Sequence, residues 1–176
     1  MDIEFPIFKY HKDPINSGSI ITGSFTCPVC KKDRTYAYVG PFFSIEDVEH
    51  ICPWCIADGS AAKKYDGEFQ DSALVEEIIN QNDLDELIHR TPGYMGWQQE
   101  QWLVHCGLPC QFIAHVGWKE IEEQNIDVEE DIRKLSKEYD LTEIDFKKRL
   151  VNNGLLQGYL FKCVKCGKYR LTSDCD

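Results

Sequence analysis

The residues best suited to chemistry in this 176-residue chain are its nine cysteines. Eight of them form four close pairs: Cys27-Pro-Val-Cys30, Cys52-Pro-Trp-Cys55, Cys106-Gly-Leu-Pro-Cys110 and Cys163-Val-Lys-Cys166. A tight turn carrying C-x-x-C aims two sulfurs at one point, and two such turns complete a tetrahedral shell around a metal ion. In a reducing compartment this pairing indicates metal ligation rather than disulfides. The ninth cysteine, Cys175, is predicted to be a free thiol.

The first predicted site joins two C-x-x-C pairs. It consists of Cys27, Cys30, Cys52 and Cys55, with 21 residues between Cys30 and Cys52, enough for a β-hairpin that brings the second pair back. Four thiolates leave no open position on the ion, which favours a structural zinc. An iron centre uses the same ligands and is the alternative. A thioredoxin-like redox motif is disfavoured, because it needs one C-x-x-C beside a βαβ pattern.

The second predicted site ties distant segments together. Its expected ligands are Cys106, Cys110, Cys163 and Cys166, with 52 residues between the two pairs. Residues 158–172 are predicted to form two strands joined by a cysteine turn. The alternative is that Cys106 and Cys110 are packed thiols, since free cysteine is commonly buried. We therefore expect two Zn²⁺ ions in all.

Apolar spacing and turn residues predict the elements that position these cysteines. Strands are expected at residues 25–30, 36–39 and 112–116 and within 158–172. Helices are expected at residues 44–47, near 56–64, at 73–79, around 84–88, and at 98–105, 128–139 and 144–151. Asp58 and Ser60 are expected to cap the helix that follows Cys55, although the same loop could bind a ligand.

These elements predict an α+β protein with two zinc-ribbon-like or treble-clef-like four-cysteine sites joined by a helical, aromatic-rich middle. Residues 1–70 are expected to hold an N-terminal arm and the first finger-like unit. Residues 71–176 are expected to form the helical middle, closed by the discontinuous second site that joins 106–110 with 158–172. The whole chain is expected to form one compact globule.

Charge and hydropathy narrow the class of protein. The formal net charge is −11, which disfavours nucleic-acid binding because phosphate affinity depends on Lys and Arg. The exception is a basic C-terminal ribbon of Lys162, Lys165, Lys168 and Arg170. No run approaches the roughly 18–20 apolar residues that span a membrane. The N-terminus lacks the basic start and apolar segment of a signal peptide, so a cytoplasmic location is predicted.

Several motifs resemble the CbrC family of small bacterial proteins of unassigned biochemistry. They are Phe5-Pro-x-Phe8-x-Tyr10-His11-x-Asp13-Pro14, Cys52-Pro-Trp-Cys-Ile-Ala-Asp-Gly-Ser-Ala-Ala62, Pro92-Gly-Tyr-x-Gly-Trp-Gln98, His105-Cys106, Gly117-Trp118 and Phe161-x-Cys163-x-x-Cys166-Gly167. The resemblance runs nearly end to end. It implies a bacterial cytosolic metalloprotein and adds no known reaction.

Two functions of different classes follow from these residues. The first is an interaction module, in which zinc sites hold a surface and the aromatic segment 91–118 with the acidic segment 119–143 engages a protein partner. The alternative is a zinc-dependent hydrolase, with His105 in place of a cysteine ligand and a zinc-bound water near His105 and His115. No triad or acid–base pair is recognisable, so an enzyme is disfavoured and no catalytic residue is predicted.

Core packing and backbone contacts are the expected roles of two histidines, His11 and His115, and of the tryptophan pair Trp97 and Trp102. His11 is expected to pack at the surface and to bond a backbone group, and His115 to be a core histidine. Trp97 and Trp102 lie five residues apart on a predicted helix, so one of them is expected to be buried and the other exposed.

Overall fold

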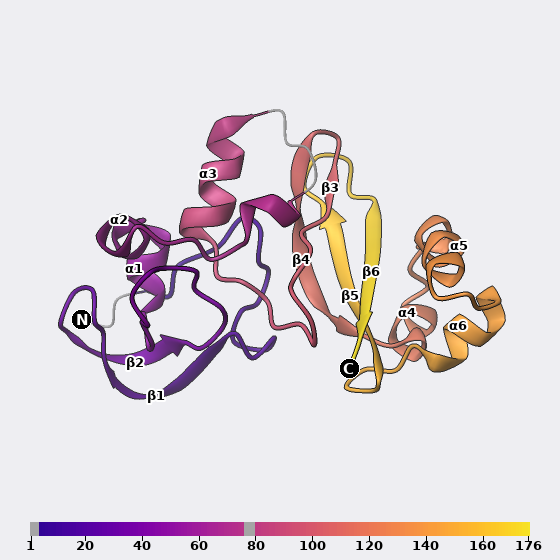
Figure 1. The fold of residues 1–176 in the computed structure, drawn as a ribbon, viewed down its shortest axis with the longest axis horizontal. Coiled ribbons are helices and arrows are strands. Elements are labelled where there is room, and N and C mark those ends of the chain that lie inside the picture. The colour runs from indigo at the N-terminus through magenta and orange to yellow at the C-terminus, as the bar shows by residue number, and fades with distance from the viewer. Residues whose placement is uncertain (1–3, 76–79) are drawn as a thin grey trace.

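The computed structural model describes residues 4–75 and 80–176 and contains two sheets (Figure 1). The N-terminal part is built on an antiparallel hairpin followed by two short helices: β1 (Ile20–Thr26), β2 (Asp33–Tyr38), α1 (Pro53–Ala57) and α2 (Ser60–Tyr65). Its core gathers Phe8, Ile20, Tyr38, Ile51, Ile56 and Phe69, all of them buried. A 3₁₀ turn, η1 (Ser72–Leu74), and helix α3 (Gln81–Arg90) then lead toward the second sheet.

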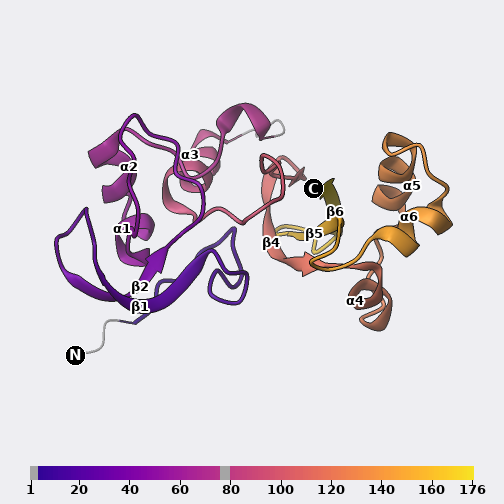
Figure 2. The ribbon, with the colours of Figure 1, turned by 60° about the horizontal axis from the view of Figure 1, so that its bottom comes forward.

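The C-terminal part is an antiparallel meander of four strands, in the order β3 (Val104–His105), β4 (Leu108–Val116), β5 (Leu156–Cys163) and β6 (Tyr169–Cys175). Between β4 and β5 the chain forms α4 (Trp118–Glu123), α5 (Glu129–Glu138) and α6 (Glu143–Arg149). These three helices lie on one side of the sheet, and the N-terminal part lies on the other (Figures 1 and 2). The sheet is therefore the middle layer of the molecule.

Strand β5 is buried on both faces because both layers pack against it. Tyr159, Phe161 and Cys163 face an aromatic cluster with Tyr94, Trp102 and Phe112, whereas Leu156 and Leu160 belong to the cluster formed with the three helices. The alternation follows the two-residue period of a strand. It explains why apolar residues of this strand, such as Tyr159, Leu160 and Phe161, follow one another instead of alternating with polar ones.

The N-terminal arm connects the two parts directly. Lys12 N–H donates to Phe112 O at 2.9 Å and Phe112 N–H donates to Tyr10 O at 2.7 Å, so the arm pairs with the edge of β4 beyond β3. The Tyr10 hydroxyl, fully buried, donates to Asp83 of α3 at 2.5 Å, and Lys9 forms an ion pair with the same carboxylate at 2.7 Å. Together these contacts fix the arm between β4 and α3.

The mixed helix and strand architecture, with two cysteine clusters joined by a middle region, is confirmed. Two predicted helices are wrong. Residues 44–47 are irregular, because Phe43 pairs with Glu68 and the Ser44 hydroxyl donates to Glu46 O. Residues 98–105 end in strand β3, because the turn at 106–107 folds them back onto β4. The predicted helix at 73–79 lies partly outside the described residues. The start of it that the structure describes belongs to the 3₁₀ turn η1.

The division of the chain at residues 70 and 71 stays a prediction. Among the residues that the structure describes, no helix is both long and apolar enough to cross a membrane.

Candidate metal centres

The first centre lies between the tip of the β1–β2 hairpin and the start of α1. The sulfurs of Cys27, Cys30, Cys52 and Cys55 all lie within 4.8 Å of one another. Two of the sulfur–sulfur distances, Cys27 to Cys55 and Cys30 to Cys52, are 3.9 Å. A tetrahedral ion with zinc–sulfur bonds of about 2.3 Å requires sulfurs about 3.8 Å apart. The four thiols therefore fit one tetrahedral ion.

Backbone hydrogen bonds shape both halves of this centre. Cys27 N–H donates to Lys32 O and Lys31 N–H donates to Cys27 O, with Lys31 at φ 58°, which closes a tight turn. Cys52 precedes the first turn of α1, where Pro53 needs no hydrogen-bond partner for its nitrogen. Cys55 N–H donates to Cys52 O at 3.0 Å, so both cysteines face the hairpin tip.

The first centre is prepared for a thiolate. A hydrogen bond from the Cys52 thiol, together with backbone N–H groups of Val29, Cys30 and Cys52, lowers the pKa of Cys27 to about 4. Arg34 lies beside the centre, with its Nη2 atom 3.9 Å from Cys30 Sγ and its guanidinium 4.6 Å from the Trp54 ring centre. Cys27 and Cys52 are fully buried. Deprotonated sulfur and a nearby cation are what a buried divalent thiolate site needs.

The second centre lies at one end of the four-stranded sheet. His105 at the end of β3, Cys106 in the following turn, and Cys163 and Cys166 at the β5–β6 turn place their ligand atoms within 4.8 Å of one another. His105 Nδ1 lies 3.3 Å from both Cys106 Sγ and Cys166 Sγ. Zinc–nitrogen bonds of about 2.0 Å and zinc–sulfur bonds of about 2.3 Å imply a separation of about 3.5 Å. One histidine and three cysteines thus fit a second ion.

The β5–β6 turn repeats the turn of the first centre. Cys163 N–H donates to Lys168 O at 2.8 Å and Gly167 N–H donates to Cys163 O at 3.0 Å, with Gly167 at φ 76°. Cys166 N–H also donates to Cys163 Sγ at 3.5 Å. Burial raises the pKa of Cys163, but the backbone N–H groups of Cys166 and Lys165, together with side-chain hydrogen bonds to His105 and Cys166, outweigh it and lower the net pKa to about 6. The second turn is therefore also prepared to hold a thiolate.

The β3–β4 turn supplies the other two ligands. Cys106 and Gly107 have φ values of 56° and 73°, the left-handed conformation that both central residues of a type I′ hairpin require. His105 pairs with Leu108 across this turn. Cys106 is exposed at the tip and His105 is half-buried just before it. A two-residue turn thus puts adjacent residues, rather than spaced cysteines, on the same ion.

The structure groups His105, and not the expected Cys110, with the other three residues. Cys110 is fully buried among the aromatic rings, pairs in register with Cys163, and gives its N–H to Leu103 O. Because the turn ends at Gly107, Cys110 lies inside β4 and away from the tip. The C-x-x-x-C spacing suggested one continuous loop. The signals for the observed set were the Cys106-Gly107 turn and the histidine directly before it.

The capping residues and Cys175 lie away from the two centres. Asp58 accepts from Ser60 N–H at 2.8 Å at the start of α2, as expected of a cap. Cys175 is free of disulfides and half-buried. Trp102 is buried and Trp97 is 52% exposed, so one tryptophan of the pair is exposed as predicted.

His11 and His115, the other two histidines with predicted roles, also lie away from the ligand sets. His11 bonds the backbone at Pro92 O, as expected, but its predicted surface position is wrong, because the arm packs against β4 and buries the ring completely. His115 is half-buried rather than a fully enclosed core residue. It lies at the opposite end of β4 from His105, about 20 Å away at roughly 3.3 Å per residue.

Comparison with known proteins finds matches over almost the whole chain. The model of an uncharacterised protein family, UPF0167, matches residues 5–175. This chain belongs to the UPF0167 family. A UPF0167 protein of Mycobacterium bovis is 39% identical over 180 residues, covering 97% of this chain and 94% of the relative. A UPF0167 protein of Pseudomonas aeruginosa is 43% identical over 124 residues, covering 69% of each. No solved structure matches the chain.

Membership of an uncharacterised bacterial family is thereby confirmed. The resemblance to the CbrC family stays a prediction.

Proposed function

We propose that this UPF0167 protein binds two structural zinc ions, and that the ribbon-like scaffold they hold serves as an interaction module for a protein partner. The observation that carries the proposal is the pair of ligand sets, each with four donor atoms within 4.8 Å of one another. Four protein ligands close a tetrahedral shell and leave no position for substrate. Both ions would therefore join chain segments rather than act on a bound molecule.

Zinc is favoured over iron by the second set. Mixed cysteine and histidine ligation with tetrahedral geometry is typical of structural zinc, whereas mononuclear iron and iron–sulfur centres favour four thiolates. The two turns share one backbone geometry, which supports the same ion in both places. The ions would be bound by the protein's deprotonated ligands and would add folding free energy.

The hydrolase alternative receives less support. It requires His105 and His115 beside one zinc-bound water, but His105 lies in β3 opposite the first residue of β4, whereas His115 lies near the other end of β4. His115 Nε2 instead donates to Met95 O at 2.7 Å. His105 itself completes the second ligand set and so would not be available as a base.

The charged segments suggest where a partner would not bind. Two of the four basic side chains of the C-terminal ribbon are paired within the protein, since Lys168 pairs with Glu130 at 2.6 Å and Arg170 pairs with Asp131 at 3.1 Å. Asp131 is buried and also accepts from Leu171 N–H. These pairs hold α5 against β6, which argues against a nucleic-acid surface and gives part of the acidic segment an internal role.

Exposed apolar side chains suggest the partner surface instead. Ile144, Val151 and Leu155 are 67%, 51% and 78% exposed, and all three come from the short stretch between the start of α6 and the start of β5. We propose that these three side chains form one surface patch, since contiguous exposed apolar surface favours a protein contact. The stretch is also anchored to the sheet, because Val151 N–H donates to Leu156 O.

Metal content tests the first half of the proposal. Native mass spectrometry under reducing conditions should find two zinc ions per chain. Cobalt-loaded protein should show absorption of one four-sulfur and one three-sulfur, one-nitrogen tetrahedral site. One ion per chain, or iron in purified protein, would contradict the proposal.

Crosslinking in cells tests the second half. We expect Leu155→Glu to abolish capture of a specific partner while zinc content stays at two. Ile45→Glu is the matched control, because Ile45 is fully exposed in the N-terminal part and lies outside the proposed surface. Equal loss in both variants, or no specific partner with the wild-type chain, would refute the interaction role.

A further inference from the structure

The two turns that carry the second centre each hold one exposed thiol. Cys106 lies at the tip of the β3–β4 turn and Cys166 lies in the β5–β6 turn, and both residues are exposed. Because β4 and β5 are antiparallel, the start of β4 and the end of β5 lie at the same end of the sheet (Figure 1). Two cysteines from distant parts of the chain therefore meet at the surface.

The sulfurs of these two cysteines are close enough to be joined by a small movement. They lie within 4.8 Å of each other, and each lies 3.3 Å from the same nitrogen, His105 Nδ1. A disulfide needs a sulfur–sulfur distance of about 2.0 Å. Both cysteines belong to turns and not to the paired part of a strand, so closing this gap breaks no strand pairing.

Cys163, the third thiol of the second centre, is less accessible. It is 2% exposed, its sulfur accepts from Cys166 N–H at 3.5 Å, and the same sulfur lies 3.6 Å from His105 O. It also belongs to β5, where it pairs in register with Cys110. A reagent in solution therefore reaches Cys106 and Cys166 before it reaches Cys163.

The first centre offers no such pair, because none of its four cysteines is exposed. Cys27 and Cys52 are fully buried, Cys55 is 4% exposed, and Cys30 is half-buried. Oxidation of a cysteine requires thiolate character and access of the oxidant to the sulfur. The two centres of one chain should therefore differ in their response to an oxidant.

We propose that Cys106 and Cys166 form a redox-sensitive modification site, which a hydroperoxide such as hydrogen peroxide oxidises to a disulfide. The inference rests on the proposed zinc function, since it treats both residues as zinc-bound thiolates, and it adds a regulation of the second ion. In a reducing compartment disulfides of this kind are usually transient and redox-sensing.

The reaction balances with the peroxide as the sole oxidant. One thiolate attacks a peroxide oxygen, the O–O bond breaks, and the released hydroxide takes a proton from solvent, which leaves a sulfenic acid and one water. The second thiolate attacks the sulfenic sulfur, and the departing hydroxide takes another proton to form a second water. The two thiolates lose two electrons in all. Two ligands of the set, His105 and Cys163, remain, which is too few for a tetrahedral site, so the ion leaves as hydrated Zn²⁺.

Hydrogen peroxide treatment of the full zinc-loaded chain tests the site. Released zinc is followed with a chromogenic chelator, and disulfides are mapped by peptide mass spectrometry without reduction. We expect one ion per chain to leave at least roughly tenfold faster than the other, together with formation of a Cys106–Cys166 disulfide. Dithiothreitol with added zinc should reverse both changes. Equal release from both centres, or a Cys163–Cys166 disulfide instead, would overturn the proposal.

Metal content before treatment separates failure of this inference from failure of the zinc proposal. Two zinc ions at the start, with no Cys106–Cys166 disulfide after treatment, would refute the modification site alone. Fewer than two ions at the start would contradict the zinc proposal, and the disulfide map would still decide whether these two thiols are the ones that react.

Histidine substitutions sharpen the test, because they remove a thiol and supply another zinc ligand. Cys106→His and Cys166→His should each retain two zinc ions, form no such disulfide, and release the second ion at least roughly tenfold more slowly under peroxide. Cys175→Ser is the matched control, since Cys175 is a free thiol outside both centres, and should behave as the wild-type chain. Unchanged release from the histidine variants would mean that another thiol is the target and would contradict the proposal.

Discussion

The two metal centres share one type of C-x-x-C turn but differ in the element that supplies the other two ligands. In both, the first cysteine of a C-x-x-C exchanges backbone bonds with the residues four and five positions later, and the residue after the second cysteine has a positive φ. The partner element differs: the start of α1 faces the first turn, and the β3–β4 hairpin tip faces the second. The turn therefore supplies two ligands in either setting, and the partner element decides the rest.

Burial and charge separate the two centres further. Three cysteines of the first centre are buried, and Arg34 stands beside its sulfurs. In the second centre Cys106 and Cys166 are exposed, and a histidine stands in place of one cysteine. The first centre thus sits inside a core that it helps to build. The second closes the end of a sheet whose strands are already paired along their length.

Removing one ligand from each centre should expose this difference most strongly. Cys52→Ser should lose one zinc and leave the N-terminal part unfolded, because the roughly 10–16 kcal/mol of zinc binding exceeds what so small a core supplies. Cys166→Ser should lose the other zinc yet keep a cooperative unfolding transition. Native mass spectrometry and circular dichroism would measure both effects. A folded N-terminal hairpin in Cys52→Ser would contradict the expectation that the first centre is needed for folding and the second is not.

The identity of the fourth ligand in the second centre gives the next largest effect. His105→Gln should weaken the second zinc by more than the roughly 10- to 100-fold expected for an outer-shell partner. Cys110→Ser should retain both ions, because its effect is confined to the aromatic cluster in which Cys110 is buried. Competition with a zinc-binding dye measures both affinities. Loss of zinc in Cys110→Ser with retention in His105→Gln would restore the four-cysteine set.

The contrast also shows what the sequence could predict. The first set was predictable because both pairs have the spacing that a tight turn or helix start imposes, whatever surrounds them. For the second set, the sequence could predict the C-x-x-C pair but not which residue joins Cys106. Whether Cys106 is joined by Cys110 or His105 depends on where the hairpin turns, and that is set by the pairing of Val104 with Pro109. Register is a tertiary property, because it follows from which face meets the aromatic core.

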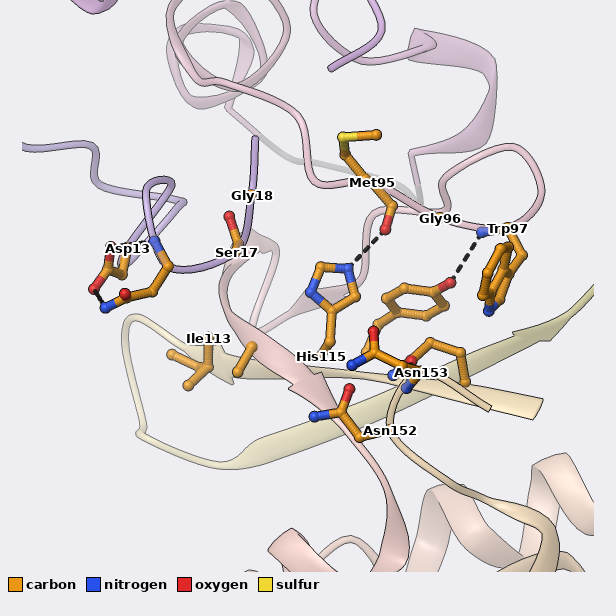
Figure 3. A pocket seen from close by; sticks show the side chains of 14 residues that line it. Asp13, Ser17, Gly18, Met95, Gly96, Trp97, Ile113, His115, Asn152 and Asn153 are labelled. Atoms are coloured by element: carbon orange, nitrogen blue, oxygen red, sulfur yellow. Dashed lines mark hydrogen bonds between the residues drawn. The ribbon is translucent and has the colours of Figure 1, made fainter. Parts of the chain in front are cut away.

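A cavity of about 500 Å³ between the N-terminal arm, the loop of Met95 and Trp97, β4 and the loop before β5 (Figure 3) was beyond prediction for the same reason. Asp13, Trp97, His115 and Asn152 come from four segments far apart in the chain, and none belongs to a motif with a fixed spacing. Isolated polar residues in a strand or loop indicate core or surface equally well. Only the packing of the arm against β4 brings them together.

Exposure predicts a difference in rate of zinc release. A chelator such as EDTA should remove one ion at least roughly tenfold faster than the other, because thiolates at an exposed tip are reached without unfolding. Cys106→Ser should remove the fast phase and leave the slow phase unchanged. Zinc release is followed with a chromogenic chelator. A single phase for both ions would show that the two centres open together.

Arg34 offers the smallest and most local test of the contrast. Burial acts to lower the pKa of Arg34, but its hydrogen bond to Cys30 and the nearby sulfur charges raise it, so the cation and the thiolates stabilise each other. The side chain is partly exposed, which limits the interaction to about 0.5–1 kcal/mol, or roughly two- to fivefold in zinc affinity. Arg34→Met should therefore speed the slow phase of release a few-fold and leave the fast phase unchanged. Lys32→Met, an exposed neighbour, is the matched control. An equal change in both phases would mean that Arg34 acts through the net charge of the protein and not through the first centre.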